Sequence, residues 1–124
     1  MEKIQVSKVS QVEAAGLMAA AGLNSADGIA TPATIAAAGE CFKLSDGTSE
    51  GVFVLERHGA RMWISGAGAV ASAGLANIGL PVIEAIARQS RCERVGFQTL
   101  RPGLVKLAKK QGYRIKGFIL EKEL

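Results

Sequence analysis

The stretch that decides the fold spans residues 60–86 and reads ARMWISGAGAVASAGLANIGLPVIEAI. It opens on a run typical of a β-strand, Ala60–Ile64, and closes in an amphipathic run that predicts the longest helix, continuing to Gln89. Gly, Ala and Ser dominate between them. A strand that enters a glycine-rich loop and then a helix N-terminus is a ready anion site, because free backbone N–H groups and the helix dipole face one point. The same plan fits an ordinary turn, and the loop matches neither the dinucleotide fingerprint nor the lysine-bearing phosphate loop.

The neighbouring strands make the predicted sheet a mixed one. A further strand is expected at Arg94–Gln98, and a strand-helix-strand unit over residues 60–98 implies a parallel pair, because a helical crossover joins parallel neighbours. Upstream, strands at 41–44 and 52–55 precede the one at 60–64, with short glycine-bearing connections between them. Such connections predict antiparallel hairpins.

The remaining elements lie at the two ends of the chain. We expect strands over Lys3–Lys8 and Tyr113–Glu121, with a bulge or twist near Gly117. We also expect helices over residues 10–21, 31–38 and 102–111, which open on the capping box Ser10–Glu13, on Thr31-Pro32 and on Pro102. The order is β-α-α-β-β-β-α-β-α-β. The sequence therefore predicts one α/β (α+β) domain over residues 1–124.

Composition excludes several classes of protein. Ala and Gly together supply 35 of 124 residues, yet 48% of residues are apolar and 21% charged, which is far from the signature of disorder. Cys41 and Cys92 are too few for a disulfide scaffold, and with His58 alone they make no zinc site, so we expect a reducing cytoplasm and no metal. The 22 uncharged residues 62–83 are too rich in Gly, Ala and Ser to favour a membrane span. The first residues also lack the pattern of a signal peptide.

Charge is divided unevenly along the chain. Residues 1–87 hold five Lys+Arg against eight Asp+Glu, a net −3, whereas residues 88–124 hold ten against three, a net +7. Such a basic cluster can meet nucleic acid, an acidic protein or a phosphate-bearing cofactor. It can equally be a solvated surface with cations at helix C-termini. The cluster comprises Arg88, Arg91, Arg94, Arg101, Lys106, Lys109, Lys110, Arg114 and Lys116.

The element order and residues 94–118, RVGFQTLRPGLVKLAKKQGYRIKGF, resemble the GCN5-related N-acetyltransferase (GNAT) superfamily. Arg101-Pro102 and Gly112-Tyr113 lie at the spacing of that family's Asn-Pro helix start and of the Gly-aromatic pair that opens its last strand. The family's pyrophosphate loop, Gln/Arg-x-x-Gly-x-Gly/Ala, falls on Ala71-Ser-Ala-Gly-Leu-Ala76. The resemblance implies a GNAT-like mixed central sheet.

The resemblance also implies acetyl-CoA as co-substrate, and it places the cofactor on named residues. The pantetheine arm would lie beside Ile64, Ser65 and Gly66, and Arg101 could reach cofactor or substrate. The pyrophosphate would lie on the backbone of Ala71, Ser72, Ala73, Gly74, Leu75 and Ala76. Two positions depart from the family pattern: Ala71 replaces the loop's Gln/Arg, and Ala108 replaces the Tyr that commonly protonates the leaving thiolate.

Two functions follow from the resemblance. In the first, a CoA thioester donates its acyl group to an amine by direct attack, with Glu56 as a candidate base or simply an exposed strand carboxylate. In the second, the fold is catalytically silent and the basic C-terminal third engages nucleic acid or an acidic protein. A homodimer through a free sheet edge is compatible with both.

Overall fold

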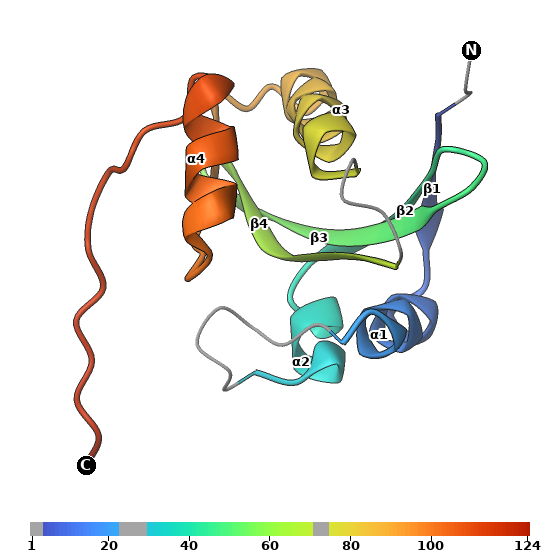
Figure 1. The fold of residues 1–124 in the computed structure, drawn as a ribbon, viewed down its shortest axis with the longest axis horizontal. Coiled ribbons are helices and arrows are strands. Elements are labelled where there is room, and N and C mark those ends of the chain that lie inside the picture. Colours follow the sequence, from blue (N-terminus) through green and yellow to red (C-terminus); the bar gives the residue numbers. More distant parts are fainter. Residues whose placement is uncertain (1–3, 23–29, 71–74) are drawn as a thin grey trace.

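Five strands form one mixed sheet in the order β1-β2-β3-β4-β5 (Figure 1). The computed structural model describes residues 4–22, 30–70 and 75–124. Neighbours among the first four strands are antiparallel, and β4 and β5 are parallel, which confirms the predicted meander and the parallel pair. The strands are β1 Gln5–Val9, β2 Glu40–Ser45, β3 Glu50–His58, β4 Arg61–Val70 and β5 Arg94–Phe97.

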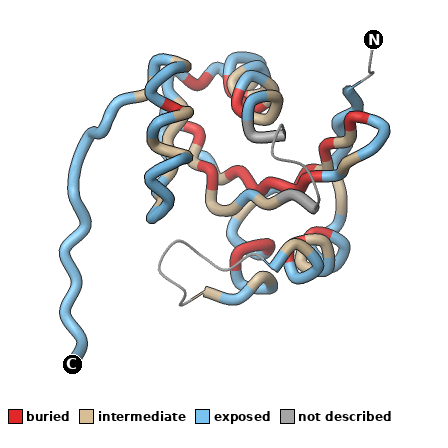
Figure 2. Tube along the Cα trace, in the orientation of Figure 1, coloured by how far each residue is buried: buried red, intermediate tan, exposed pale blue. Residues whose placement is uncertain are grey.

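The helices cover the two faces of this sheet in pairs. One face carries α1 (Gln11–Ala20) and α2 (Pro32–Ala37), and the other carries α3 (Leu75–Gln89) and α4 (Pro102–Lys110) (Figure 1). Because alternate residues of a strand point to opposite faces, each face has its own apolar core. In Figure 2 the buried residues lie between the sheet and the helices.

The two cores divide the strand residues cleanly. Against α1 and α2 pack strand residues that include Val52 and Val54, together with Met18 and Ile35 of the helices. The core against α3 and α4 comprises Phe42, Leu44, Phe53, Leu55, Met62, Ile64, Leu80, Ile83, Ala87, Cys92 and Ala108. Both cysteines are free and buried, and burial raises the pKa of the Cys41 thiol.

Local sequence signals explain where the first helices begin. The Ser10 hydroxyl accepts a hydrogen bond from the Glu13 backbone N–H at 3.1 Å, and Thr31 accepts one from Thr34 at 3.2 Å. These contacts satisfy backbone donors that a helix start leaves free. Gly112 follows α4 with φ of +94°, a conformation that favours glycine and ends the helix.

The Gly/Ala-rich stretch contains more regular structure than we expected. Strand β4 continues through Val70, where we expected the strand to stop at Ile64, and α3 already starts at Leu75. Glycine weakens a strand, but every residue of β4 except Ser65 pairs with β3, which holds the strand in place. Pro81 lies inside α3 and is exposed, and because it has no N–H, the carbonyl of Asn77 does not receive the usual helix hydrogen bond from position 81.

The expected last strand is wrong. Residues 113–124 carry no assigned strand or helix, and the chain ends in an extended segment beyond α4 (Figure 1). A strand needs hydrogen bonds to a neighbouring strand, and none of the strands in the described part of the chain pairs with this segment. None of the described helices is long and apolar enough to cross a membrane.

Candidate functional site

Strands β4 and β5 separate at a fork. They pair from Arg61 with Arg94 up to Ile64 with Phe97, where β5 ends. Strand β4 continues to Val70, and beyond Ile64 it pairs, among the residues that the structure describes, only with β3. The backbone edge of β4 is therefore freed from Ser65 onward, so the sequence-predicted trio Ile64, Ser65 and Gly66 lies at the fork.

A β-bulge occurs at the same level. On β3, Val54 pairs with Gly66 while the next residue, Leu55, pairs with Ile64, so Ser65 is the extra residue of β4. A bulge leaves its extra residue out of the hydrogen-bond ladder and re-aims the side chains beside it. Ser65 therefore has no register partner on β3 and lies one residue beyond the last pair of β4 with β5.

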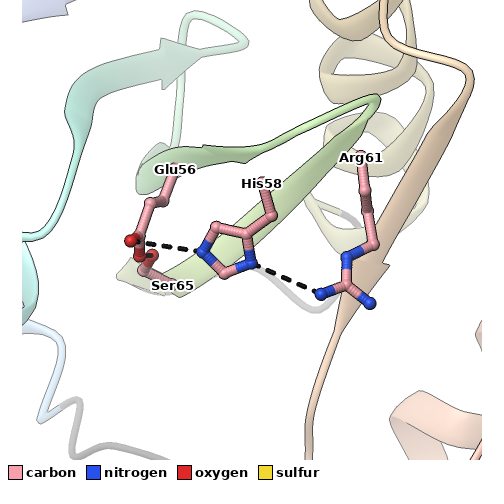
Figure 3. Close-up of polar contacts among 4 residues, drawn as sticks. All are labelled: Glu56, His58, Arg61 and Ser65. Carbon is pink, nitrogen blue, oxygen red and sulfur yellow. Dashed lines mark hydrogen bonds and ion pairs between the residues drawn. The ribbon is translucent and has the colours of Figure 1, made fainter.

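Polar side chains gather on the face of the sheet next to this bulge (Figure 3). The Ser65 hydroxyl donates a hydrogen bond of 3.3 Å to Oε2 of Glu56, and Nε2 of His58 lies 3.2 Å from Oε1 of the same carboxylate. The Arg61 guanidinium lies 3.4 Å from Nδ1 of His58. A neutral imidazole with its hydrogen on Nε2 satisfies both contacts, donating to Glu56 and accepting from Arg61.

An aromatic ring supports the cluster. Trp63 stacks on the His58 ring at 5.9 Å between centroids, and the Arg61 guanidinium lies 5.0 Å from the Trp63 ring. Gly96 of β5 makes room for this ring, because a Cβ there would lie 3.3 Å from it. The side chain of Glu56 remains 41% exposed, so the carboxylate is held in place yet open to a solute.

The glycine at the fork also has a structural reason. A Cβ on Gly66 would lie 2.5 Å from Cγ2 of Ile35, so α2 packs directly on the backbone of β4. Ile35 is buried in the core beneath α1 and α2. Gly66 therefore lets a helix approach the strand, whatever else lies near the fork.

The other predicted cofactor residues are distributed as follows. Ala71, Ser72, Ala73 and Gly74 lie outside the described residues, and Leu75 and Ala76 begin α3. Arg101 is the exposed N-cap of α4, and its side chain makes no capping hydrogen bond. The structure thus joins Glu56 to Ser65, but it does not bring Arg101 into that cluster.

Position 108 carries no acid. Ala108 is buried in the core between the sheet and α4. The position at which the family commonly has its tyrosine therefore carries no ionisable side chain in this chain. The Tyr113 hydroxyl donates to Oε2 of Glu84 at 2.8 Å, and its ring packs 5.6 Å from Phe97. Burial, reinforced by this hydrogen bond, raises the pKa of Tyr113 well above its usual range. Tyr113 therefore stays protonated and engaged with Glu84.

A broad cleft lies beside β5 and reaches Phe97, the β5 residue at the fork. It has a volume of about 1130 Å³ and is lined by β5, α3, α4 and the segment after α4. Arg61 and Trp63 border it, but Glu56, Ser65 and Gly66 do not. No three His, Cys, Asp or Glu side chains gather as metal ligands within residues 4–22, 30–70 and 75–124.

Sequence reasoning missed part of this cluster. From the sequence alone, a lone histidine beside Gly59 is expected to lie in a hairpin turn and face solvent, and Trp63 is expected to pack in the core or at an interface. In the structure the two rings stack, and His58 contacts Glu56. The spacing of Glu56 and His58, two apart on one strand and so on one face, was the available signal.

Solved structures with the same arrangement include an acetyltransferase of Trypanosoma brucei. It is 14% identical and has a TM-score of 0.62, with 98% of this chain and 100% of that chain covered. An integron cassette protein from the mobile metagenome of V. cholerae is 13% identical with a TM-score of 0.60, covering 97% of this chain and 93% of its own. No protein-family model and no curated protein matches the sequence. Taken with the β4–β5 fork, these likenesses show that the chain has a mixed α+β, GNAT-like fold.

Proposed function

We propose that this protein transfers an acyl group from a CoA thioester to an amine at the fork between β4 and β5. One observation carries the proposal: the fork, the bulge at Ser65 and the Glu56 carboxylate meet at a single level of the sheet. The similarity to an acetyltransferase structure supports the same activity. Fold alone does not decide function, so the arrangement of residues at the fork is the main support for this activity.

The reaction needs little from the protein beyond position and polarity. The amine nitrogen attacks the thioester carbonyl carbon, a C–N bond forms, the C–S bond breaks, and the CoA thiolate leaves. A backbone N–H released by the bulge and the fork can stabilise the carbonyl oxygen as it gains negative charge. We assign this role to the backbone N–H of Ser65. Ser65 is the extra residue of the bulge opposite β3 and lies beyond the last pair with β5.

We assign proton removal to Glu56. An amine that has attacked carries a positive charge and must lose a proton, which a nearby carboxylate can accept. Contacts from Ser65 and His58 fix the two carboxylate oxygens, and the open side of Glu56 allows the proton to pass on to solvent. His58 and Ser65 act here as positioning residues.

The start of α3 is the expected place for the cofactor's pyrophosphate. This helix has 15 residues and begins directly after residues 71–74. A helix N-terminus presents free N–H groups and a partial positive charge, both of which favour a phosphate. With Ala at position 71, the backbone must supply this binding without the side chain that the family uses.

The leaving thiolate departs without a side-chain acid. Ala108 cannot donate a proton, and the Tyr113 hydroxyl already donates to Glu84. General acid catalysis typically contributes about 10² to 10⁴ in rate. We therefore expect slower turnover than in relatives that keep the tyrosine.

The activity is tested by measuring free thiol released from acetyl-CoA in the presence of a panel of small amines, polyamines and peptides with free amino groups. The proposal expects release that depends on the amine and on the enzyme, with an acetylated amine detected by mass spectrometry. Thiol release that no amine accelerates would contradict acyl transfer to amines.

A basic surface favours binding of a polyanion as the second candidate. Lys106, Lys109 and Lys110 of α4, with Arg114 and Lys116 after it, are exposed, and none forms a salt bridge among the described residues. Retention on immobilised DNA that falls steeply with salt would support this function. Combined with no response to acetyl-CoA, it would replace the first proposal.

A further inference from the structure

We propose that residues 114–124, here called the tail, pair with the tail of a second copy of this chain, and that each tail fills the other copy's cleft beside β5. The result is a two-fold dimer in which the two copies exchange C-terminal strands. Three features carry this inference: the exposed apolar side chains of the tail, the free edge of β5, and the cleft between them. It does not depend on the proposed activity.

The tail exposes apolar side chains that a folded chain normally buries. Phe118 is 89% exposed, Leu120 91%, Ile119 61% and Ile115 59%. The tail runs clear of the domain and is exposed along its length (Figures 1 and 2). Contiguous apolar side chains in water mark an interaction segment. Three consecutive ones, Phe118 to Leu120, suit a strand that is covered on both faces.

Strand β5 offers a free edge to receive such a strand. In the described residues it pairs with β4 on one side and with no strand on the other. An unpaired edge presents a row of backbone N–H and C=O groups that can accept another strand. Val95, Gly96 and Phe97 are only partly buried there, so apolar surface accompanies the free backbone.

The cleft shows why a second copy, rather than the chain's own tail, fits this edge. Its volume of about 1130 Å³ has β5 along one wall and residues 114–119 of the tail along another. The tail therefore borders the cleft without filling it, and it forms no strand with β5. A strand inserted between them would find a partner on each side.

A two-fold axis supplies that strand without leaving an open end. In this dimer the two-fold axis passes between the two tails and is perpendicular to the sheet that they form. The tails then pair antiparallel. Each tail lies between two strands of the other copy, its β5 and its tail. The same pairing of tails fills the clefts of both copies. No cleft is left open for a third copy, so the assembly stops at a dimer. Pairing centred on Ile119 sets Phe118 opposite the second copy's Leu120 and Ile119 opposite itself.

The first test is the molar mass in solution, by sedimentation equilibrium. For a chain of 12.9 kDa we expect twice that mass for the wild type. Ile119→Pro removes a backbone N–H from the middle of a ladder and should give a monomer, whereas Ile119→Val should stay dimeric. Circular dichroism should show both variants folded, because the tail lies outside both cores.

The second test fixes the register. Ile119→Cys should form a disulfide between two copies under mild oxidation, because antiparallel partners on a two-fold axis bring their Cα atoms within disulfide range. Val12→Cys, at an apolar position on α1 that is even more exposed than Ile119 (84% against 61%), serves as the control and should not cross-link. A monomeric wild type, or a dimer that survives Ile119→Pro, would overturn the exchange of tails.

Discussion

The hydroxyl of Ser65 donates a hydrogen bond of 3.3 Å to the carboxylate of Glu56 across strands β3 and β4. This contact lies where the pairing register shifts between Val54 and Leu55, and just beyond the last pair of β4 with β5. A strand that loses one neighbour and bulges against the other exposes backbone polar groups next to a fixed carboxylate. Each of the proposed chemical roles derives from this relationship.

Replacing Glu56 with Gln should slow acyl transfer while leaving cofactor binding intact. Glutamine keeps the shape and still accepts the Ser65 hydrogen bond, but it cannot take a proton from the amine. We expect kcat to fall about 10² to 10⁴-fold, the usual contribution of a general base. Steady-state kinetics measures this, and Glu50→Gln, at the exposed start of the same strand, is the control. Unchanged kcat for Glu56→Gln would remove Glu56 from the mechanism.

Adding a methyl group at Gly66 should destabilise the fold. Its Cβ would lie 2.5 Å from Cγ2 of Ile35, so α2 must shift outward. Overpacking of this kind costs about 1–3 kcal/mol, measured by urea unfolding. Gly16→Ala, in α1 with open space around it, should instead stabilise by about 0.5–1 kcal/mol.

A double variant tests whether contact with Ile35 is the reason that Gly66→Ala lowers the free energy of unfolding. Ile35→Ala removes the atom that the new methyl group meets, so Gly66→Ala with Ile35→Ala should cost less than the sum of the two single changes. Strict additivity would show that α2 does not press on the backbone of Gly66.

Removing the hydroxyl of Tyr113, the chain's single tyrosine, should abolish one pH-dependent part of the stability. Burial and the bond to Glu84 raise its pKa in the fold above the unfolded value of about 10. A raised pKa gives stability that is fully present below pH 10 and is lost as the pH rises further, because the unfolded tyrosine ionises first.

The measurement for Tyr113 is urea unfolding of wild type and Tyr113→Phe between pH 7 and pH 11. At pH 7 the wild type should be more stable by about 1 kcal/mol, the net worth of one hydrogen bond. The difference should shrink above pH 10, since only the wild type then loses stability through tyrosine ionisation. A difference that stays constant over this range would refute the contact with Glu84.

A carboxylate placed at residue 74, immediately before α3, should repel the cofactor. Gly74→Glu puts a negative charge where the resemblance places pyrophosphate, and we expect acetyl-CoA to bind at least tenfold more weakly, by isothermal titration. Gly103→Glu adds the same side chain at the exposed start of α4 and should leave the affinity unchanged. Equal affinities for both variants would place the pyrophosphate elsewhere.

The sequence predicted the strand order because its signals are local and mutually consistent. Ser10 and Thr31 mark helix starts, and the helix between β4 and β5 requires a parallel pair. The expected last strand at 113–121 failed for a physical reason. Alternating apolar residues such as Ile115 and Ile119 show that a segment can pair, but they do not show that a partner lies within the same chain.

The site was predictable only in part. The resemblance places the pantetheine arm beside residues 64–66, and β4 and β5 separate at these residues. The cofactor's position there stays a prediction. The contact of Glu56 with Ser65 and His58 depends on a one-residue bulge, which changes the facing of every side chain beyond it. No periodicity around Ser65 marks that shift. Strand pairing had to be known before Glu56 could be joined to its neighbours.

The most direct test of the central claim is the thermal unfolding of the wild-type protein with and without acetyl-CoA. At about 100 times the dissociation constant, a ligand that binds only the folded state stabilises it by about 2.7 kcal/mol, a shift of several degrees for a domain of this size. We predict such a shift with acetyl-CoA and with CoA, and none with an equal concentration of inorganic pyrophosphate. An unfolding temperature that does not move with millimolar acetyl-CoA would contradict the account.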